Sequence, residues 1–565
     1  MRSERTAGTA LTLLIAAAVL APGAASAQED LEPLRRIVIQ DGGRLKPLDT
    51  FARETARRVT GAKAFTGGER VGRLEAVEWV LAMLARPSVW REERMVRVAD
   101  ADVRAAAGLP ADRDRFSYAE LAGEDRFLEV AAAVHEKTRS DIPLEPFEAG
   151  IATLHETLSL LSAVFSGEAL RIVPVTASGD GTWLSVADLG PSGPGRALEG
   201  ARQGLVGLVG AYESGDRAAV GRAASTLGGE LARLGGADYP AAADLAREVR
   251  YNRLKPFRLS WVLFLVAFLL LLASFPLRSR AAGVAGLLLA AGGLAANTYG
   301  LLLRSLISER APVTNMYETV VFVAWGAVLL ALAFDLLYRS RYASTCATGL
   351  AVVALILADN VPIFDSAIAP LVPVLRDNMW LTLHVLTIML GYAAFFLAMG
   401  LGHLNLGLYF FAPQRAALLK TLSQFLYRSL QVGTLFLAVG TLLGGVWASY
   451  SWGRFWGWDP KETWALIALL GYLAVLHGRF IGWFKDFGMA VGSLLGFLLV
   501  LMAWYGVNFI LGTGLHSYGF GAGGTGWVVG FVSFELVVIV LAFSRRARLR
   551  APAPAGQPAL GAARS

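Results

Sequence analysis

The chain has 565 residues, of which 55% are hydrophobic and 17% are charged, and its formal net charge is +7. So high an apolar fraction excludes an ordinary soluble protein. The positive charge gives no indication of nucleic-acid binding, because Lys and Arg are scattered and form no basic stripe with interleaved aromatic residues. Nearly all acidic residues precede Tyr251 and long uncharged runs follow it, which predicts a soluble half and then a membrane half.

Residues 1–27 predict a secretory signal peptide. Arg2 and Arg5 precede a short apolar run at residues 11–20, and Ala25–Ala27 precedes an acidic segment. This is the pattern of a peptide that is cleaved after an Ala-x-Ala site. An uncleaved membrane anchor is the alternative, and both interpretations place the next region outside the cytoplasm.

Residues 28–255 have the composition of a soluble domain, which we interpret as a mainly helical α+β domain whose last helix leads into the membrane. Strand-like runs occur at residues 36–40, 170–175 and 183–186, and helical periodicity at residues 73–85, 118–137, 147–165 and 196–250. His135 and His155 each lie beside a Glu without the spacing of metal ligands. We interpret both as ordinary surface or packed residues.

The single cysteine, Cys346, lies inside an apolar run. The chain therefore forms no internal disulfide, Cys-x-x-Cys redox pair or Cys-x-x-Cys-His haem attachment site. We interpret Cys346 as a small buried hydrophobic residue. Any thiol chemistry would then belong to a partner.

From Leu259 onward, about nine apolar runs are long enough to cross a bilayer. They cover roughly residues 259–276, 281–303, 317–337, 344–358, 379–411, 427–447, 461–481, 487–511 and 526–543. The predicted fold class is a polytopic α-helical membrane protein, with a transmembrane domain at residues 256–545 after the soluble domain. Residues 546–565 form a Pro/Ala/Gly-rich tail that should be disordered.

The distribution of Lys and Arg predicts the orientation of these helices. With the soluble domain outside, the inner loops and the C-terminus hold about thirteen Lys and Arg residues and the outer loops five. This agrees with the orientation that a signal peptide would give. It predicts a protein of the bacterial cytoplasmic membrane with a periplasmic N-terminal domain and a cytoplasmic C-terminus.

Four histidines of the membrane half lie at two predicted depths. His384 begins the fifth span at its outer end, and His516 lies in a neutral, Gly-rich outer loop. His403 follows His384 by nineteen residues and His477 follows Asp459 by eighteen, which places both about 27–28 Å deeper. Two imidazoles at one level can hold a haem iron between them, although a single His in a membrane helix also serves as an interhelical hydrogen-bond partner.

The segment Trp452–Trp464 joins the sixth and seventh spans on the predicted outer face. Five of its thirteen residues are aromatic, which is more than interfacial anchoring requires. Trp452, Trp456 and Trp458 are separated by glycines and predict an aromatic platform for a flat partner.

Four polar residues of this segment are open to two interpretations. Asp459 and Glu462 have the spacing of N-cap and N3 residues around Pro460, so they could cap a helix without binding a ligand. Arg454 and Lys461 could pair with haem propionates or contact lipid phosphate.

Residues 452–464 read Trp-Gly-Arg-Phe-Trp-Gly-Trp-Asp-Pro-Lys-Glu-Thr-Trp and resemble the tryptophan-rich WWD signature of haem-handling proteins in cytochrome c maturation. Pro312–Glu318, His384–Tyr392 and Gly514–Gly519 resemble, in the same order, landmarks of the CcsA/ResC branch, the membrane component of the System II cytochrome c synthase. The similarity covers about residues 259–543. The Pro-Lys-Glu-Thr-Trp continuation and the His-Ser-Tyr-Gly loop fit this branch better than the short haem exporter or the long System I lyase subunit.

This resemblance implies a site for non-covalent haem b. It implies that His384 and His516 are axial ligands of a haem on the outer platform, and that His477 is a ligand of a haem entering from the inner side. In the family, a ResB-type partner supplies a fourth histidine. The residues before Leu259 contain no recognisable ResB-like spans, and we hypothesise that His403 fills this role.

The implied function is cytochrome c biogenesis: haem is moved to the periplasmic face and presented to the CxxCH motif of apocytochrome c. Thioredoxin-like proteins would keep the two thiols reduced, and the chain would be part of a holocytochrome c synthase in the lipid membrane. A haem exporter or chaperone that leaves attachment to a partner is the main alternative. A scaffold or sensor whose aromatic residues only anchor it is another. The outer domain and Glu535 have no assigned role.

Overall fold

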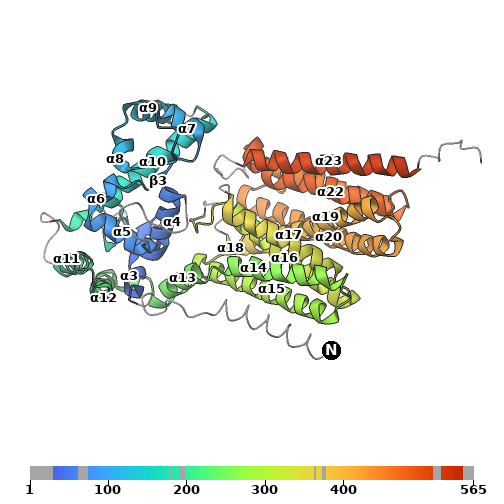
Figure 1. Ribbon diagram of the computed structural model, residues 1–565, viewed down its shortest axis with the longest axis horizontal. Coiled ribbons are helices and arrows are strands. Elements are labelled where there is room, and N and C mark those ends of the chain that lie inside the picture. Colours follow the sequence, from blue (N-terminus) through green and yellow to red (C-terminus); the bar gives the residue numbers. More distant parts are fainter. Residues whose placement is uncertain are drawn as a thin grey trace, which may run out of the picture. The chain divides into compact units, whose positions relative to one another are not determined.

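The computed structural model describes residues 30–61, 74–140, 142–176, 181–190, 198–361, 364–371, 377–512 and 524–550 (Figure 1). The chain divides into two compact units, Met1–Arg253 and Leu254–Ser565. This division falls next to the domain boundary expected at residue 255. The predicted signal peptide, residues 1–27, lies outside the described residues.

The described part of the first unit is mainly helical, with three small antiparallel strand pairs. The pairs are β1 (Val38–Asp41) with β2 (Arg44–Pro47), β3 (Val96–Arg97) with β4 (Arg115–Phe116), and β5 (Val173–Thr176) with β6 (Trp183–Leu184). The helices are α3 (Glu32–Arg35), α4 (Leu48–Thr60), α5 (Ala76–Ala85), α6 (Pro87–Glu92), α7 (Ala101–Ala106), α8 (Tyr118–Ala122), α9 (Asp125–Arg139), α10 (Pro146–Ser166), η1 (Ala187–Leu189), α11 (Glu199–Glu213), α12 (Arg217–Gly235), η3 (Gly236–Asp238) and α13 (Ala242–Leu254). The predicted mainly helical α+β class is confirmed.

Two stretches that we predicted as continuous helical regions are divided by local caps. Residues 118–137 form α8 and α9, with a break after Gly123. Residues 196–250 form α11, α12 and α13. Here α11 is followed by Gly215, whose φ of 77° suits glycine, and Asp216 caps α12 by accepting hydrogen bonds from two backbone N–H groups.

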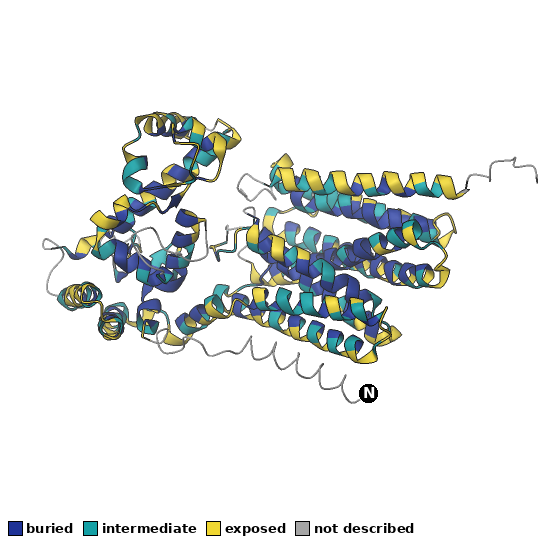
Figure 2. Ribbon diagram, viewed as in Figure 1, coloured by how far each residue is buried: buried dark blue, intermediate teal, exposed yellow. Residues whose placement is uncertain are grey.

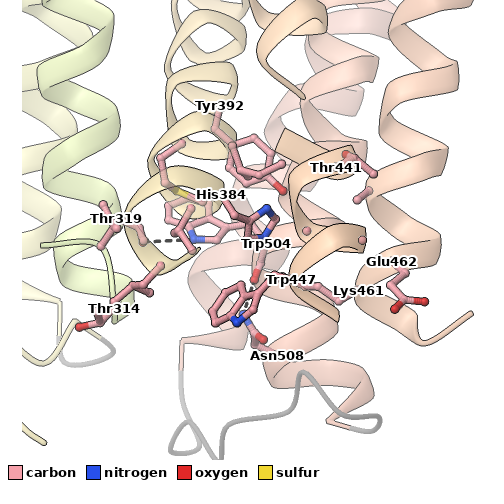
Figure 3. A pocket seen from close by; sticks show the side chains of 18 of the residues that line it. Thr314, Thr319, His384, Tyr392, Thr441, Trp447, Lys461, Glu462, Trp504 and Asn508 are labelled. Carbon is pink, nitrogen blue, oxygen red and sulfur yellow. Dashed lines mark hydrogen bonds between the residues drawn. The ribbon is translucent and has the colours of Figure 1, made fainter. Parts of the chain in front are cut away.

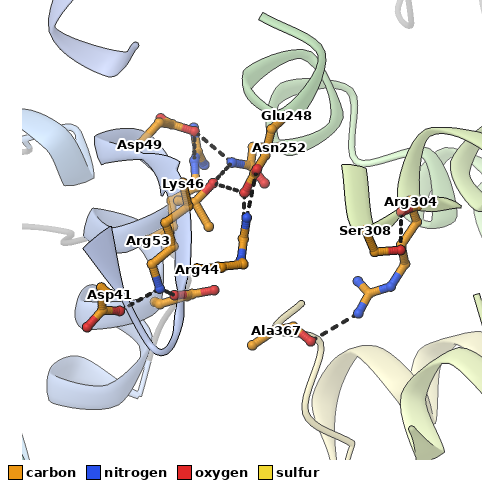
Figure 4. Close-up of polar contacts among 12 residues, drawn as sticks. Asp41, Arg44, Lys46, Asp49, Arg53, Glu248, Asn252, Arg304, Ser308 and Ala367 are labelled. Carbon is orange, nitrogen blue, oxygen red and sulfur yellow. Dashed lines mark hydrogen bonds and ion pairs between the residues drawn. The ribbon is translucent and has the colours of Figure 1, made fainter. Parts of the chain in front are cut away.

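Buried polar contacts connect helix α13 to α4 and β2 (Figure 4). Arg44 of β2 donates two hydrogen bonds, of 3.0 and 2.7 Å, to the Glu248 carboxylate of α13. Thr50 of α4 donates to the same carboxylate at 2.7 Å. Asn252 donates to Asp49 and Thr50 at 3.0 and 2.9 Å. These bonds offset the cost of burying the Glu248 charge.

We expect Glu248→Ala to loosen α13, because Arg44 and Thr50 would lose their acceptor at a cost of about 3 kcal/mol. Hydrogen exchange of the α4 and α13 amides in the full-length protein should become roughly a hundredfold faster. Glu230→Ala breaks only a surface ion pair with Arg233, three residues away on the same helix, and is the control. Equal exchange in the two variants would contradict the expectation.

The second unit is a bundle of membrane-type helices. In the part of the chain that the structure describes, nine helices are long and apolar enough to cross a membrane, which confirms the predicted number. They comprise α13 with α14 (Pro256–Ser274), α15 (Arg280–Ser308), α16 (Met316–Tyr338), α17 (Tyr342–Asn360), α18 (Asn378–Trp380) with η5 (Leu381–Val385) and α19 (Leu386–Phe411), α20 (Ala416–Trp452), α21 (Pro460–Phe480), α22 (Asp486–Leu501) with η6 (Met502–Leu511), and α23 (Thr525–Arg550).

Helix α19 is the most enclosed of these helices, and α23 the least. Within the most apolar window of each, 72% of the residues are buried for α19 and 17% for α23. Figure 2 shows the same contrast between the dark centre of the bundle and the mostly yellow α23. The protein is therefore a polytopic membrane protein organised around α19.

Helices α20 and α23 extend beyond the spans we predicted. Helix α20 has 37 residues, which is about 55 Å and exceeds the roughly 30 Å of a hydrocarbon core. Lys420 and Arg428, two of the thirteen basic residues counted on the inner side, therefore lie in a helix. Helix α23 extends to Arg550, so residues 546–550 of the expected disordered tail are helical. Long basic side chains can end in polar surroundings without interrupting a helix.

Glycines on one face of α20 allow it to lie close to α19. A Cβ at Gly433 would lie 2.5 Å from the Phe395 ring of α19. A Cβ at Gly444 would lie 2.6 Å from Cε1 of His384, on the turn before α19. Small residues at such contacts let membrane helices pack backbone to backbone. This contact places His384 against α20.

Candidate functional site

A cavity lies where α16 and α21 begin and where α20 and η6 end (Figure 3). Together with the open space at its mouth, it encloses about 1100 Å³. Its lining is mostly apolar. The polar and aromatic side chains among the lining residues are Thr314, Asn315, Thr319, His384, Tyr392, Thr441, Trp447, Phe455, Trp456, Lys461, Glu462, Trp504 and Asn508.

The position of His384 suits a metal ligand. Its Nδ1 lies 2.7 Å from the carbonyl oxygen of Gly440 on α20. A carbonyl only accepts hydrogen bonds, so Nδ1 carries the hydrogen, and the neutral ring has its lone pair on Nε2. A backbone carbonyl that holds one ring nitrogen in this way is common behind metal-bound histidines. The Trp447 ring meets the His384 ring edge to face, with centroids 5.8 Å apart.

Two π-helical turns bring side chains into the cavity. His384 lies on η5, and Trp504 and Asn508 lie on η6. The Trp504 indole donates a 3.2 Å hydrogen bond to Thr319 Oγ1, and Asn508 Nδ2 donates to the Trp504 carbonyl at 2.7 Å (Figure 3). π-Helical turns are rare and frequently occur at functional sites.

Three buried polar atoms of the cavity have no hydrogen-bond partner among the described residues: Trp447 Nε1, Trp456 Nε1 and Asn508 Oδ1. An unpaired buried polar group costs about 1–3 kcal/mol. Two donors and one acceptor that all lie on a single cavity therefore indicate a ligand with polar groups of its own.

The segment between α20 and α21 is shaped by caps. Asp459 Oδ1 accepts from the Glu462 N–H at 3.0 Å, and Glu462 Oε2 accepts from the Asp459 N–H at 3.4 Å. The Glu462 carboxylate also accepts from the Gly457 N–H at 2.6 Å. The capping interpretation of Asp459 and Glu462 is thus confirmed. Capping holds the backbone of residues 457–459 and so directs the neighbouring tryptophans.

The three tryptophans of the expected platform do not lie together in the cavity. Trp456 lines it, whereas Trp458 is 69% exposed and meets Trp456 edge to face, with ring centroids 5.8 Å apart. Trp452, the last residue of α20, is not among the lining residues. A chain reversal with a φ of 58° at Trp458 turns successive side chains in different directions. The expected flat platform of three neighbouring rings is therefore not formed.

The two basic residues of the segment have different surroundings. Lys461 lines the cavity. The Arg454 guanidinium instead lies over the Gly457 backbone, where a Cβ would be only 0.9 Å from Nη1. A side chain at position 457 would therefore displace the Arg454 guanidinium. Lys461 is thus placed for a ligand in the cavity, and Arg454 is not.

Other cavity residues were not predicted from the sequence. Trp447 lies inside the sixth expected span, and Trp504 and Asn508 lie near the end of the eighth. Aromatic and amide side chains near the outer end of a span were the available signal, but the same residues also occur as interfacial anchors. Only the tertiary packing around His384 distinguishes the residues that line the cavity from interfacial anchors.

At the inner level, His403 faces a carboxylate. Its Nε2 lies 3.2 Å from Glu535 Oε2 on α23, its Nδ1 lies 3.0 Å from the Met399 carbonyl, and its ring stacks on Phe534. Glu535 is 1% exposed. The imidazole is thus a neighbour of the intramembrane carboxyl group that the sequence left unexplained, although His403 Nε2 and both Glu535 oxygens make no hydrogen bond with the described residues. To bind iron through Nε2, His403 would first have to release Glu535.

Of the remaining two predicted ligands, only His477 lies in the described part of the chain, and it is not among the residues that line the cavity. His477 is exposed on α21, and its Nδ1 lies 2.7 Å from the Leu473 carbonyl. As for His384, this assigns the hydrogen to Nδ1 and the lone pair to Nε2. His516 lies outside the described residues.

Comparison with known proteins relates the chain to cytochrome c assembly proteins. A family described as "Cytochrome C assembly protein" matches residues 313–516. The protein NrfI of Wolinella succinogenes is 30% identical over 495 residues, which are 84% of this chain, and this chain spans 53% of NrfI. The cytochrome c biogenesis protein CcsA of Synechococcus sp. strain RCC307 is 35% identical over 300 residues, 46% of this chain and 94% of that protein. CcsA of Prochlorococcus marinus strain NATL2A is 34% identical over 256 residues, 39% of this chain and 81% of that protein.

The chain thus forms a polytopic helical bundle with a cavity at one end, and residues 313–516 match the cytochrome c assembly family. Because the chain spans nearly the whole length of a CcsA at 35% identity, it belongs to the CcsA family of cytochrome c biogenesis proteins.

We expect His403→Phe to destabilise the detergent-purified protein by about 3 kcal/mol, because it leaves the buried Glu535 carboxyl group without its partner. Glu535→Leu should cost less, because the His403 side chain that it leaves is 25% exposed. The double variant should recover most of this loss, since an apolar pair needs no compensation. Thermal unfolding checks the expectation, with His477→Phe at an exposed position as the control. If neither single variant changed the thermal stability, the pair would not be formed.

Proposed function

We propose that this chain binds haem in the outer cavity through His384 and presents it outside the membrane to the CxxCH motif of apocytochrome c. The observation that supports this most directly is the His384 ring, held by Gly440 so that Nε2 carries the lone pair within a cavity lined by aromatic rings. In this proposal haem is the substrate that the protein positions.

The cavity fits the two chemical parts of haem. Trp447, Trp456 and Trp504 offer apolar ring surface to a macrocycle. The unpaired indole N–H groups of Trp447 and Trp456, together with the Lys461 ammonium, suit the two propionate carboxylates. Arg454 would then contact lipid phosphate.

The other haem ligands are part of the same proposal. His516 would be the second axial ligand in the outer site. His477 would bind haem at the inner level with a histidine of a ResB-type subunit, since His403 is engaged by Glu535. In this scheme the chain lies in the bacterial inner membrane, with the first unit periplasmic and the residues after α23 cytoplasmic.

The chemistry that follows needs no nucleophile from this chain. Each substrate thiol adds its sulfur to one carbon of a haem vinyl group and its hydrogen to the other, so a C–S and a C–H bond replace an S–H bond and a C=C π bond. Nothing is oxidised, provided that thioredoxin-like partners deliver the thiols reduced. Cys346, the single cysteine, is buried in α17.

In His384→Gly we expect the purified protein to lose the absorbance of histidine-ligated haem and cytochrome c maturation to fall at least tenfold, because the iron loses an axial ligand. Added imidazole should restore both, since it can occupy the space of the missing ring. His155→Ala in the first unit is the control. Normal maturation in His384→Gly without imidazole would refute the assignment.

Incubation of haem-loaded protein with reduced apocytochrome c tests the attachment step. A covalent cytochrome c supports the synthase. Transfer of haem without a thioether bond would instead show a haem exporter or chaperone, and would leave the His384 site intact.

Gly444→Ala should weaken haem binding about tenfold, because its Cβ would lie 2.6 Å from His384 Cε1 and push the ring from the Gly440 carbonyl. Titration with haem, followed by absorbance, measures the change. Gly407→Ala is the matched control, since a Cβ there meets no atom within 4 Å. Equal affinity of the two variants would show that this contact does not position His384.

A further inference from the structure

We propose that the buried ion pair Arg304–Glu318 is a positioning device that holds the rim of the haem cavity and thereby sets how His384 binds haem. This inference rests on the proposed function. It concerns residues that lie behind the cavity: neither Arg304 nor Glu318 is among the lining residues.

The pair is fully enclosed. Arg304 of α15 and Glu318 of α16 have side chains with 0% exposure, and Arg304 Nε donates to Glu318 Oε1 at 2.6 Å. Arg304 also donates through Nη1 and Nη2 to the carbonyls of Ser366 and Ala367, at 2.8 and 3.0 Å (Figure 4). The planar fork of arginine thus joins one carboxylate to the backbone of a distant loop, which lysine could not do.

The other carboxylate oxygen holds the cavity rim. Glu318 Oε2 accepts from the backbone N–H of Thr314 and from its hydroxyl, both at 2.7 Å. Asn315 Oδ1 accepts from the Glu318 N–H at 2.9 Å and so caps α16. Thr314 and Asn315 both line the cavity. The position of this rim therefore depends on one buried carboxylate.

The same helix end reaches the neighbourhood of His384. Thr319, the residue after Glu318, accepts the hydrogen bond of the Trp504 indole at 3.2 Å. Trp504 and His384 both line the cavity (Figure 3). A shift of the first turn of α16 would move the rim and the acceptor of this indole together.

A contribution to stability does not by itself explain why the chain has a buried ion pair at this position. Replacing a buried ion pair with apolar side chains of similar volume is often neutral or stabilising, whereas removal of one charge is costly. Charged residues in membrane helices are accordingly functional by default. A fully enclosed pair that bonds to two loop segments, one of them the cavity rim, fits a role in positioning.

The decisive variant is the double substitution R304M/E318L, which removes both charges and keeps an apolar interior. We expect it to remain monodisperse in detergent, to bind added ferric haem at least tenfold more weakly than wild type, and to show an altered axial-ligand spectrum. Glu318→Gln should change affinity and spectrum in the same direction, because it places an N–H donor against Arg304 or Thr314. This milder variant keeps the test decisive if the double variant does not fold.

Asp335→Asn is the matched control. Asp335 is a second buried carboxylate of α16, at its other end, and accepts from the Ser344 N–H at 2.7 Å. It should leave the haem affinity and spectrum unchanged. Wild-type affinity and spectrum in folded R304M/E318L and Glu318→Gln would overturn the proposal, and so would an equal loss in Asp335→Asn. Failure of the proposed function would look different, since wild-type protein would then show no haem signal that depends on His384.

Discussion

The close contact between α19 and α20 is the constraint on which the cavity depends. Because Gly433 and Gly444 have no side chain, the two helices can approach each other closely at these positions. The His384 ring can then reach the Gly440 carbonyl at 2.7 Å. One backbone hydrogen bond fixes the orientation of this ring and its neutral tautomer. Trp447, on the same face of α20, packs against it. A candidate metal ligand is therefore oriented by helix packing, and the surrounding loops only complete its cavity.

Around this contact, polar groups that are uncommon in membrane helices connect neighbouring helices and loops through hydrogen bonds and ion pairs. Asp459 and Glu462 cap α21 and hold the backbone that carries Trp456. Arg304 and Glu318 tie the start of α16 to the rim. His403 and Glu535 join α23 to α19. Arg304, Glu318 and Glu535 have side chains that are 0–1% exposed, so these pairs constrain their neighbours more strongly than a surface pair could.

The sequence pattern predicted the number of spans, because a run of about twenty apolar residues matches the thickness of a bilayer core when it is helical. It also predicted the capping box at Asp459 and Glu462. It did not show that Trp452 and Trp458 are absent from the cavity lining, because the direction of a side chain in a loop or at a helix end depends on the backbone path and not on residue type. Nor did it connect His403 with Glu535, since 132 positions separate them in the chain and a depth estimate gives the level of a residue but not the face of its helix.

The sequence by itself thus determined the class of this protein: a membrane bundle of the CcsA family with a tryptophan-rich segment and a few intramembrane histidines. Only the tertiary structure decided which of these residues form a site. Apolar runs and helix caps are local features, because residues close together in the chain determine them. A cavity is made by side chains from helices far apart in the chain, and its lining depends on helix rotation and on close packing at particular glycines.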